Sequence, residues 1–203
     1  MNVKQIKVFI LLMGVFFNAS SFANQTSEQT KQAEIFWQQL QQGGKVVLLR
    51  HAQVDKEFAS PFTLDESCFS ERNLNETGKQ QAASIKQAFQ KNNVTIEKVL
   101  SSPYCRTKET TELAFGSYKV EPNLHLTKAI PADQAALKIE QTRELIGNYQ
   151  ASSDSANLVL VTHRPNILDL TNVNTQPADM VLLLPLGDGL FEVLAHYRYA
   201  TQF

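Results

Sequence analysis

Two histidines follow short apolar runs that lie far apart in the sequence. His51 comes after the run 45–49, with Arg50 directly before it, and His163 comes after the run 158–162. Such runs are typical of buried parallel strands, and ligands of open α/β sheets bind beyond the carboxyl ends of these strands. We therefore expect both imidazoles to face one crevice.

Two arginines are expected in the same crevice. Arg50 lies at a strand end, where a buried charged side chain needs a partner. Arg106 opens a predicted helix, whose free N–H groups also favour an anion. Guanidinium forks match phosphate oxygens, and a neutral imidazole can attack phosphorus. The residue types therefore suit phosphoryl chemistry, with His51, Arg50, Arg106 and His163 as candidate catalytic residues.

Predicted strands and helices alternate along the chain. Strands are expected at 45–49, 94–100, 118–120 and 158–162, followed by a hairpin of 180–184 and 190–196. Helices are expected at 33–40, from a capping box at Thr77–Gln80 onward, at 106–115 and over the apolar positions 135–149. This alternation predicts an α/β fold, a three-layer sandwich whose mostly parallel central sheet has helices on both faces.

The N-terminus has the pattern of a secretory signal peptide, predicted over residues 1–23. Two lysines precede an apolar stretch at 8–17, and small residues at 21 and 23 precede the expected cleavage site. A membrane-spanning helix takes about 20 apolar residues, about twice this stretch. We therefore expect no stable membrane anchor after cleavage, and a periplasmic or secreted protein.

Residues 24–203 are then expected to form a single domain. Its 180 residues suffice for one hydrophobic core. They carry 17 basic and 20 acidic side chains, a formal charge of −3. This balance offers no basic stripe, so nucleic acid is not an expected partner.

The chain has two cysteines, Cys68 and Cys105. In an oxidising compartment an even count permits a disulfide, which would brace the loop over the crevice against the turn that precedes Arg106. Two unpaired buried thiols are the alternative.

No metal site is predicted. Two cysteines and scattered acids give no zinc-ligand spacing, and neither a metal nor a cofactor is expected. The other two histidines, His125 and His196, lack the strand-end context with an adjacent arginine, so we expect them to be structural or exposed.

Four segments, taken in order, resemble motifs of the histidine phosphatase superfamily, which has the phosphoglycerate mutase-like fold. Arg50–Ala52 resembles the Arg-His-Gly motif, with alanine in place of glycine, and Arg72–Ala82 resembles the Arg-x-Leu segment that opens a long helix. Ser101–Thr107 is similar to the Ser-Ser-Pro-x-x-Arg motif, and Val161–His163 to the Val-x-His strand end. The resemblance extends from about Gly43 to the C-terminus.

This resemblance implies a metal-independent phosphatase that works through a phosphohistidine intermediate. His51 would attack phosphorus and hold the phosphoryl group, while Arg50, Arg106 and His163 would bind its oxygens. Phosphoryl transfer needs mainly positioning and charge stabilisation. The signal peptide, Arg-His-Ala motif and short domain are most similar to envelope phosphatases such as the lipopolysaccharide core heptose phosphate phosphatases. That similarity implies a phosphorylated small molecule or envelope glycan as the substrate.

The chain departs from the family pattern at the proton donor. It lacks the glutamate that many relatives carry after the next strand, and Arg164 follows His163 where the acid phosphatase branch has aspartate. Asp133 is the candidate donor, with Asp55 and Glu140 as alternatives. General-acid catalysis is typically worth about 10²–10⁴ in rate. Without it, two alternatives stay open: a phosphohistidine phosphatase, and a non-catalytic protein that binds phosphorylated ligands.

Overall fold

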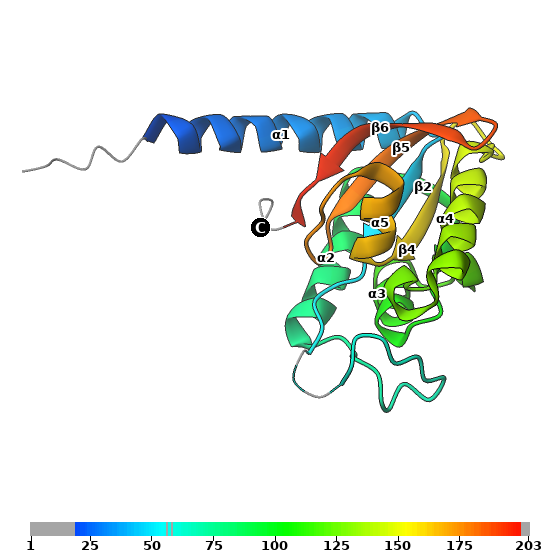
Figure 1. Ribbon diagram of the computed structural model, residues 1–203. Coiled ribbons are helices and arrows are strands. Elements are labelled where there is room, and N and C mark those ends of the chain that lie inside the picture. Colours follow the sequence, from blue (N-terminus) through cyan, green and yellow to red (C-terminus); the bar gives the residue numbers. More distant parts are fainter. Residues whose placement is uncertain (1–18, 56, 58, 200–203) are drawn as a thin grey trace, which may run out of the picture.

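The computed structural model describes residues 19–55, 57 and 59–199 (Figure 1). Most of the predicted signal peptide lies outside these residues, and 19–23 form the beginning of helix α1, Ala19–Gln41. The helix predicted at 33–40 is therefore the last part of a longer one. None of the helices in the described ranges has both the length and the apolar character that a membrane span requires.

A six-stranded mixed sheet forms the centre of the molecule, in the order β3-β2-β4-β1-β5-β6. Its strands are β1 Val46–Arg50, β2 Thr95–Ser101, β3 Lys119–Val120, β4 Ala156–Thr162, β5 Met180–Gly187 and β6 Leu190–Tyr197. The strands β1 to β4 are parallel, and the β5–β6 hairpin continues the sheet antiparallel to β1. The predicted α/β architecture with a mostly parallel sheet is confirmed.

Helices cover both faces of the sheet and form the outer layers of the sandwich (Figure 1). Alternate residues of β1 point to opposite faces: Val47 and Leu49 pack in the core under α1, α2 and α3, and Val46 and Leu48 in the core under α4 and α5. The helices that follow α1 are α2 Glu76–Lys91, α3 Cys105–Phe115, α4 Ala132–Gly147 and α5 Arg164–Thr171, with short 3₁₀ turns at Pro122–Leu124 and Thr127–Ala129.

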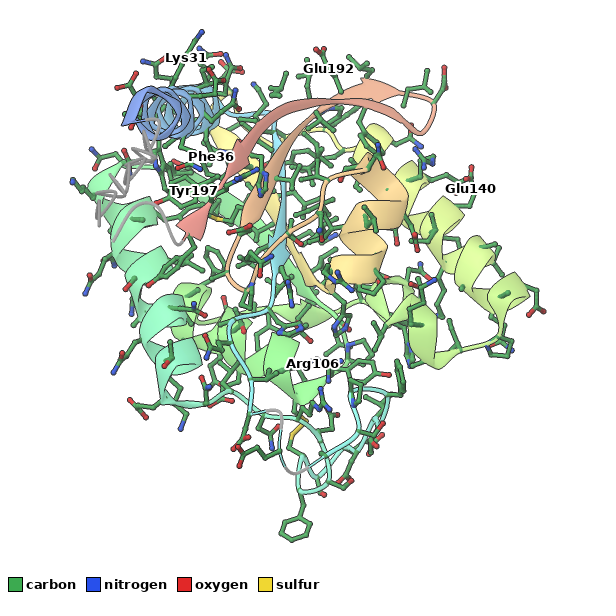
Figure 2. The ribbon with its side chains drawn as sticks, turned by 60° about the vertical axis from the view of Figure 1, so that its left-hand side comes forward. Lys31, Phe36, Arg106, Glu140, Glu192 and Tyr197 are labelled. Carbon is green, nitrogen blue, oxygen red and sulfur yellow. A yellow bond between two sulfur atoms is a disulfide. The ribbon has the colours of Figure 1, made fainter. Side chains whose placement is uncertain are left out.

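Helix α1 packs along β6 through aromatic side chains. The rings of Phe36 and Tyr197 have centroids 5.3 Å apart (Figure 2). Trp37 contacts both rings and also reaches Phe89 of α2. The C-terminal half of α1 is therefore part of the same core as the sheet.

Helix α2 begins earlier than the predicted capping box at Thr77. Asn75 is the N-cap, because its side chain accepts the backbone N–H of Gly78 at 2.9 Å and asparagine is among the strongest caps. A Cβ on Gly78 would lie 2.0 Å from the carbonyl oxygen of Gln53. Glycine at this position lets α2 pack against the segment that follows His51.

Candidate active site

The carboxyl ends of β1, β2 and β4 meet at one edge of the sheet and bring together residues that are distant in the sequence. His51 follows β1 and His163 follows β4, and their ring centroids are 5.5 Å apart. Backbone hydrogen bonds join the ends of β1 and β2 to the end of β4. His51 N–H donates to the carbonyl of Thr162, and Ser102 N–H donates to the carbonyl of Val161. The two predicted histidines therefore share one site.

The free lone pair of the His51 ring is on Nε2, which has no hydrogen-bond partner among the described residues. Its Nδ1 lies 2.8 Å from the backbone carbonyl of Ala52, and because a carbonyl oxygen can only accept, Nδ1 carries the proton. Burial, and after it the positive charges of Arg106 and Arg50, lower the pKa of His51 to about 3. The ring is therefore neutral near pH 7, the state that a nucleophilic imidazole needs.

Arg106 contacts the second histidine directly. Its Nη2 donates to the carbonyl of Pro61 at 3.1 Å and lies 3.4 Å from Nδ1 of His163. Because a guanidinium group can only donate, His163 accepts at Nδ1 and donates from Nε2 to the hydroxyl of Ser102, 2.8 Å away. Burial, and then the charge of Arg106, lower the pKa of His163 well below its ordinary value.

Each of the two arginines has a buried nitrogen without an acceptor among the described residues: Nε of Arg50 and Nη1 of Arg106. Nη1 of Arg50 donates to the carbonyl of Thr175. Nη1 of Arg106 lies 3.8 Å from the Glu71 carboxylate, too far for a hydrogen bond. A buried donor without an acceptor is costly, so both nitrogens favour a further acceptor; Nη1 of Arg106 already forms an ion pair with Glu71, and Nε of Arg50 has no such partner among the described residues. The described part of the chain contains no cluster of three histidine, cysteine or acidic side chains that could hold a metal ion.

Glu71 is a residue of the site that was not predicted from the sequence. Its buried carboxylate accepts the backbone N–H groups of Cys105 at 2.9 Å and Asp65 at 3.1 Å. It lies at the N-terminus of α3, where the helix dipole favours negative charge, and beside Arg106. Its position directly before Arg72, in a segment that resembles a family motif, was the only signal that could have identified it.

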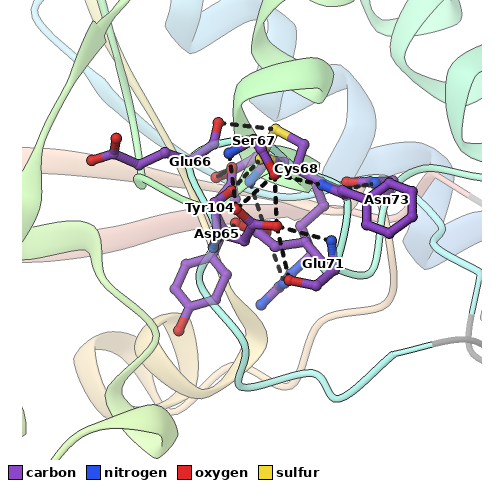
Figure 3. Close-up of a disulfide and its surroundings, with 12 residues drawn as sticks. Asp65, Glu66, Ser67, Cys68, Glu71, Asn73 and Tyr104 are labelled. Carbon is purple, nitrogen blue, oxygen red and sulfur yellow. Dashed lines mark hydrogen bonds and ion pairs between the residues drawn. A yellow bond between two sulfur atoms is a disulfide. The ribbon is translucent and has the colours of Figure 1, made fainter.

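A disulfide joins Cys68 to Cys105, with the two Cα atoms 5.7 Å apart (Figure 3). It connects the loop of residues 53–74, hereafter the site loop, to the first residue of α3. The site loop also supplies the backbone carbonyls that accept hydrogen bonds from Arg106 and from the hydroxyl of Tyr104. The loop is thus fastened to α3 beside the histidine pair.

Tyr104 lies against His163. Its buried ring has its centroid 5.0 Å from that of His163 and 5.1 Å from that of His125, and the guanidinium of Arg106 lies 4.3 Å from the same ring. His125 is half-buried next to the site, although it was expected to be structural or exposed. His196 lies on β6 and bonds to the buried carboxylate of Asp179.

Two of the three candidate proton donors are exposed on α4. Asp133 is exposed in the first turn of α4. Glu140 is exposed on the outer side of the same helix, far from Arg106 in Figure 2. The carboxylate of Asp55 accepts the backbone N–H of Glu57. No contact joins these three carboxylates to the two site histidines in the part of the chain that the structure describes.

Known proteins resemble this chain in sequence over part of its length. Residues 46–127 match the family model described as the histidine phosphatase superfamily, branch 1. The matched range contains His51, Arg50 and Arg106, whereas His163 lies beyond it. No curated protein sequence matches the chain significantly.

Solved structures resemble this chain in fold. The protein histidine phosphatase SixA, complexed with tungstate, is 17% identical with a TM-score of 0.55, covering 78% of this chain and 99% of its own. A putative alpha-ribazole-5'-P phosphatase from Escherichia coli K-12 is 13% identical with a TM-score of 0.56, covering 76% and 97%. A mycobacterial glucosyl-3-phosphoglycerate phosphatase is 17% identical with a TM-score of 0.52, covering 75% and 99%. The chain therefore has the fold of the histidine phosphatases.

Proposed function

We propose that this protein is a phosphatase of the histidine phosphatase superfamily and hydrolyses phosphomonoesters through a phosphohistidine on His51. The observation that carries the proposal is the pairing of a neutral imidazole, with a free lone pair at Nε2, and two buried guanidinium nitrogens that lack acceptors. The oxygens of a phosphate monoester supply such acceptors, and its phosphorus is the electrophile that the lone pair requires.

The proposed reaction has two displacement steps. Nε2 of His51 attacks phosphorus and the ester P–O bond breaks, and water then attacks the phosphohistidine to release inorganic phosphate. Arg50, Arg106 and His163 bind the equatorial oxygens, whose charge the two guanidiniums stabilise in the transition state. Since Nδ1 of His163 accepts from Arg106 in the free site, this ring can bind a phosphoryl oxygen only once Nδ1 carries a proton.

For the substrate we propose a phosphorylated small molecule or envelope glycan in the periplasm, of the kind that lipopolysaccharide core heptose phosphate phosphatases act on. Two features support an exported protein: the signal-peptide pattern of residues 1–23, and a disulfide, a bond that persists in oxidising compartments. A phosphohistidine phosphatase is the second candidate. It is favoured because none of the candidate donors Asp133, Asp55 and Glu140 contacts the histidine pair within the described residues, and a phosphoramidate has a good leaving group.

The first test compares wild type with His51→Ala on 4-nitrophenyl phosphate, whose leaving group needs little protonation. We expect wild type to release nitrophenol and His51→Ala to lose at least about 10³-fold in kcat/KM, because the nucleophile itself is removed. His196→Ala, which removes an imidazole on β6, is the matched control and should retain activity. Equal rates for wild type and His51→Ala would refute the proposal.

The second test looks for the covalent intermediate. Wild type mixed with a ³²P-labelled phosphomonoester and quenched in base should retain label, and quenching in acid should remove it, because phosphohistidine survives base and is lost in acid. A protein that only binds phosphorylated ligands would release no phosphate and form no covalent label. A phosphate-release screen over envelope sugar phosphates, nucleotides and phosphopeptides would then identify the substrate class.

A further inference from the structure

The proposed reaction on alkyl phosphates requires a proton for the departing alkoxide, and within the described residues no contact joins the carboxylates predicted for this purpose to the histidine pair. We propose that His125 donates this proton, a role that rests on the proposed phosphatase function.

The segment that carries His125 is fastened to the strand end that carries His163. Thr162, the last residue of β4, donates from its hydroxyl to the carbonyl of Leu124 at 3.2 Å. The buried side chain of Asn166, in the first turn of α5, donates to the carbonyl of His125 at 2.7 Å. These bonds fix the backbone of His125 beside the site.

The ring of His125 is one aromatic ring away from the catalytic pair. Tyr104 contacts His163 on one side and His125 on the other, with centroid distances of 5.0 and 5.1 Å, so the two imidazole centroids are at most 10.1 Å apart. The proposed role requires the ester oxygen of a phosphoryl group bound between His51 and His163 to point past Tyr104 toward His125.

His125 has one nitrogen free for this task. Its Nδ1 lies 3.2 Å from the carbonyl of Leu126 and carries a proton, because that oxygen only accepts. Nε2 has no hydrogen-bond partner within the ranges that the structure describes. When the ring is protonated, Nε2–H is therefore the proton available to a ligand.

The other polar groups near this ring are already engaged. The Tyr104 hydroxyl donates to the carbonyl of Phe62, and burial raises the pKa of Tyr104. Both oxygens of the Glu71 carboxylate accept backbone N–H groups. No other group beside His125 in the described structure combines a free nitrogen or oxygen with an ordinary pKa near neutrality.

The charges around His125 make its protonation depend on the substrate. Burial lowers its pKa, the hydrogen bond to the Leu126 carbonyl raises it, and the positive charges of Lys138 on α4 and Arg106 on α3 lower it. The ring of Tyr104 lies beside it. A phosphate dianion in the site has the opposite effect, since nearby negative charge favours the imidazolium. The proposed role therefore requires the bound substrate to increase the protonated fraction of His125.

The proton balance closes over one turnover. As Nε2 of His51 forms its bond to phosphorus, the P–O bond breaks and its electron pair takes the proton from Nε2 of His125, releasing an alcohol. Neutral His125 then takes a proton from the attacking water as the P–N bond breaks and its electron pair returns to His51. Inorganic phosphate leaves and His125 is protonated again.

The test compares two substrates that differ in their leaving groups, 4-nitrophenyl phosphate and glycerol 2-phosphate, in wild type and His125→Phe. Phenylalanine keeps a ring against Tyr104 and removes the proton. We expect kcat/KM on glycerol 2-phosphate to fall by about 10²–10⁴, whereas kcat/KM on the nitrophenyl ester should change less than about threefold because nitrophenolate needs no acid. His196→Phe is the matched control and should leave both values unchanged. His125→Asp, which restores an acidic group, should recover part of the activity on the alkyl ester.

The outcomes separate the two proposals. A wild type that hydrolyses neither ester refutes the phosphatase function and this role with it. If wild type is active and His125→Phe lowers kcat/KM equally for both substrates, this role alone is refuted. A wild type that hydrolyses only the nitrophenyl ester also refutes this role alone. If the variant fails to fold, the pH dependence of wild-type kcat/KM decides, because both substrates share the later hydrolysis of the phosphohistidine and differ only in the first step. It should fall with rising pH for glycerol 2-phosphate and not for the nitrophenyl ester, and identical profiles would overturn the proposal.

Discussion

The two site histidines are kept neutral by burial more than by their neighbours. His51 is 8% exposed and His163 is 1% exposed, and burial is the main cause of the lowered pKa of each, ahead of Arg106. A buried imidazolium beside guanidinium groups would be unfavourable on both counts. In the unfolded chain both rings return to an ordinary pKa of about 6.5.

This difference predicts acid sensitivity of the fold. Below about pH 6.5 the unfolded chain binds protons at these rings and the native state does not, so the free energy of unfolding falls as the pH is lowered, until His51 is protonated in the native state at about pH 3. Each ring contributes up to about 1.4 kcal/mol per pH unit. Urea unfolding at pH 7 and pH 5 should show the decline, and His51→Gln should reduce its slope. Identical slopes for the variant and wild type would contradict the prediction.

Residues next to regular elements could be predicted from the sequence, and residues that act through tertiary contacts could not. His51, His163 and Arg106 each lie directly after a strand or at the start of a helix, so local pattern indicated a shared edge. Glu71 and His125 gain their neighbours only when separate segments of the chain pack together. Glu71 packs on the first turn of α3, and His125 packs on the ring of Tyr104, the residue before that helix. No spacing rule in one sequence encodes such contacts.

At the scale of elements, helices and strands with a clear hydrophobic pattern could be predicted, and the short helix α5 could not. The apolar runs of β1, β4 and the β5–β6 hairpin, and the buried stripe of α2 at Ala82, Ile85 and Phe89, gave clear patterns. Helix α5 was not predicted, because its eight residues make about two turns and include Pro165, which leaves little periodicity to detect. This short helix nevertheless supplies Asn166, which fixes the segment around His125.

The contact between α2 and the segment after β1 gives a prediction at the element scale. In Gly78→Ala the new Cβ would meet the carbonyl of Gln53, and in Gly147→Ala it would meet the backbone of Gly189 at the far end of the β5–β6 hairpin. Both variants should lose about 1–3 kcal/mol of unfolding free energy through overpacking. Only Gly78→Ala should lower kcat/KM on 4-nitrophenyl phosphate, because Gln53 lies two residues after His51. Equal activity in the two variants would show that the α2 contact does not position the nucleophile.

At the scale of the whole molecule, the parallel strands bring the site residues to one edge and the site loop covers part of that edge. The loop has little regular structure of its own between β1 and α2. It is joined to the layered core by hydrogen bonds from Arg106, Tyr104 and Cys105 and by the disulfide. The loop that accepts a hydrogen bond from Arg106 is thus covalently linked to the helix that carries this arginine.

Removing that link should weaken both the fold and the site. Cys68 and Cys105 are 37 residues apart in the sequence, and the loop-closure entropy of such a cross-link corresponds to about 4 kcal/mol of unfolding free energy. The Cys68→Ser/Cys105→Ser variant should be less stable by about this amount in urea unfolding and less active on 4-nitrophenyl phosphate. Dithiothreitol should lower wild-type activity and leave the double variant unaffected. A reduced wild type with full activity would show that Arg106 is held without the disulfide.

A loop fastened in this way is not free to swing aside as a unit. The disulfide forms while the protein matures, so the position of the loop beside the histidine pair would be set before any ligand arrives. The protein would then select among esters by size: groups that are bulky close to phosphorus would be hydrolysed poorly, and groups that are bulky farther away would be tolerated. Catalysis on such a scaffold would need no gating motion, so its pace would be set by chemistry and by the escape of phosphate.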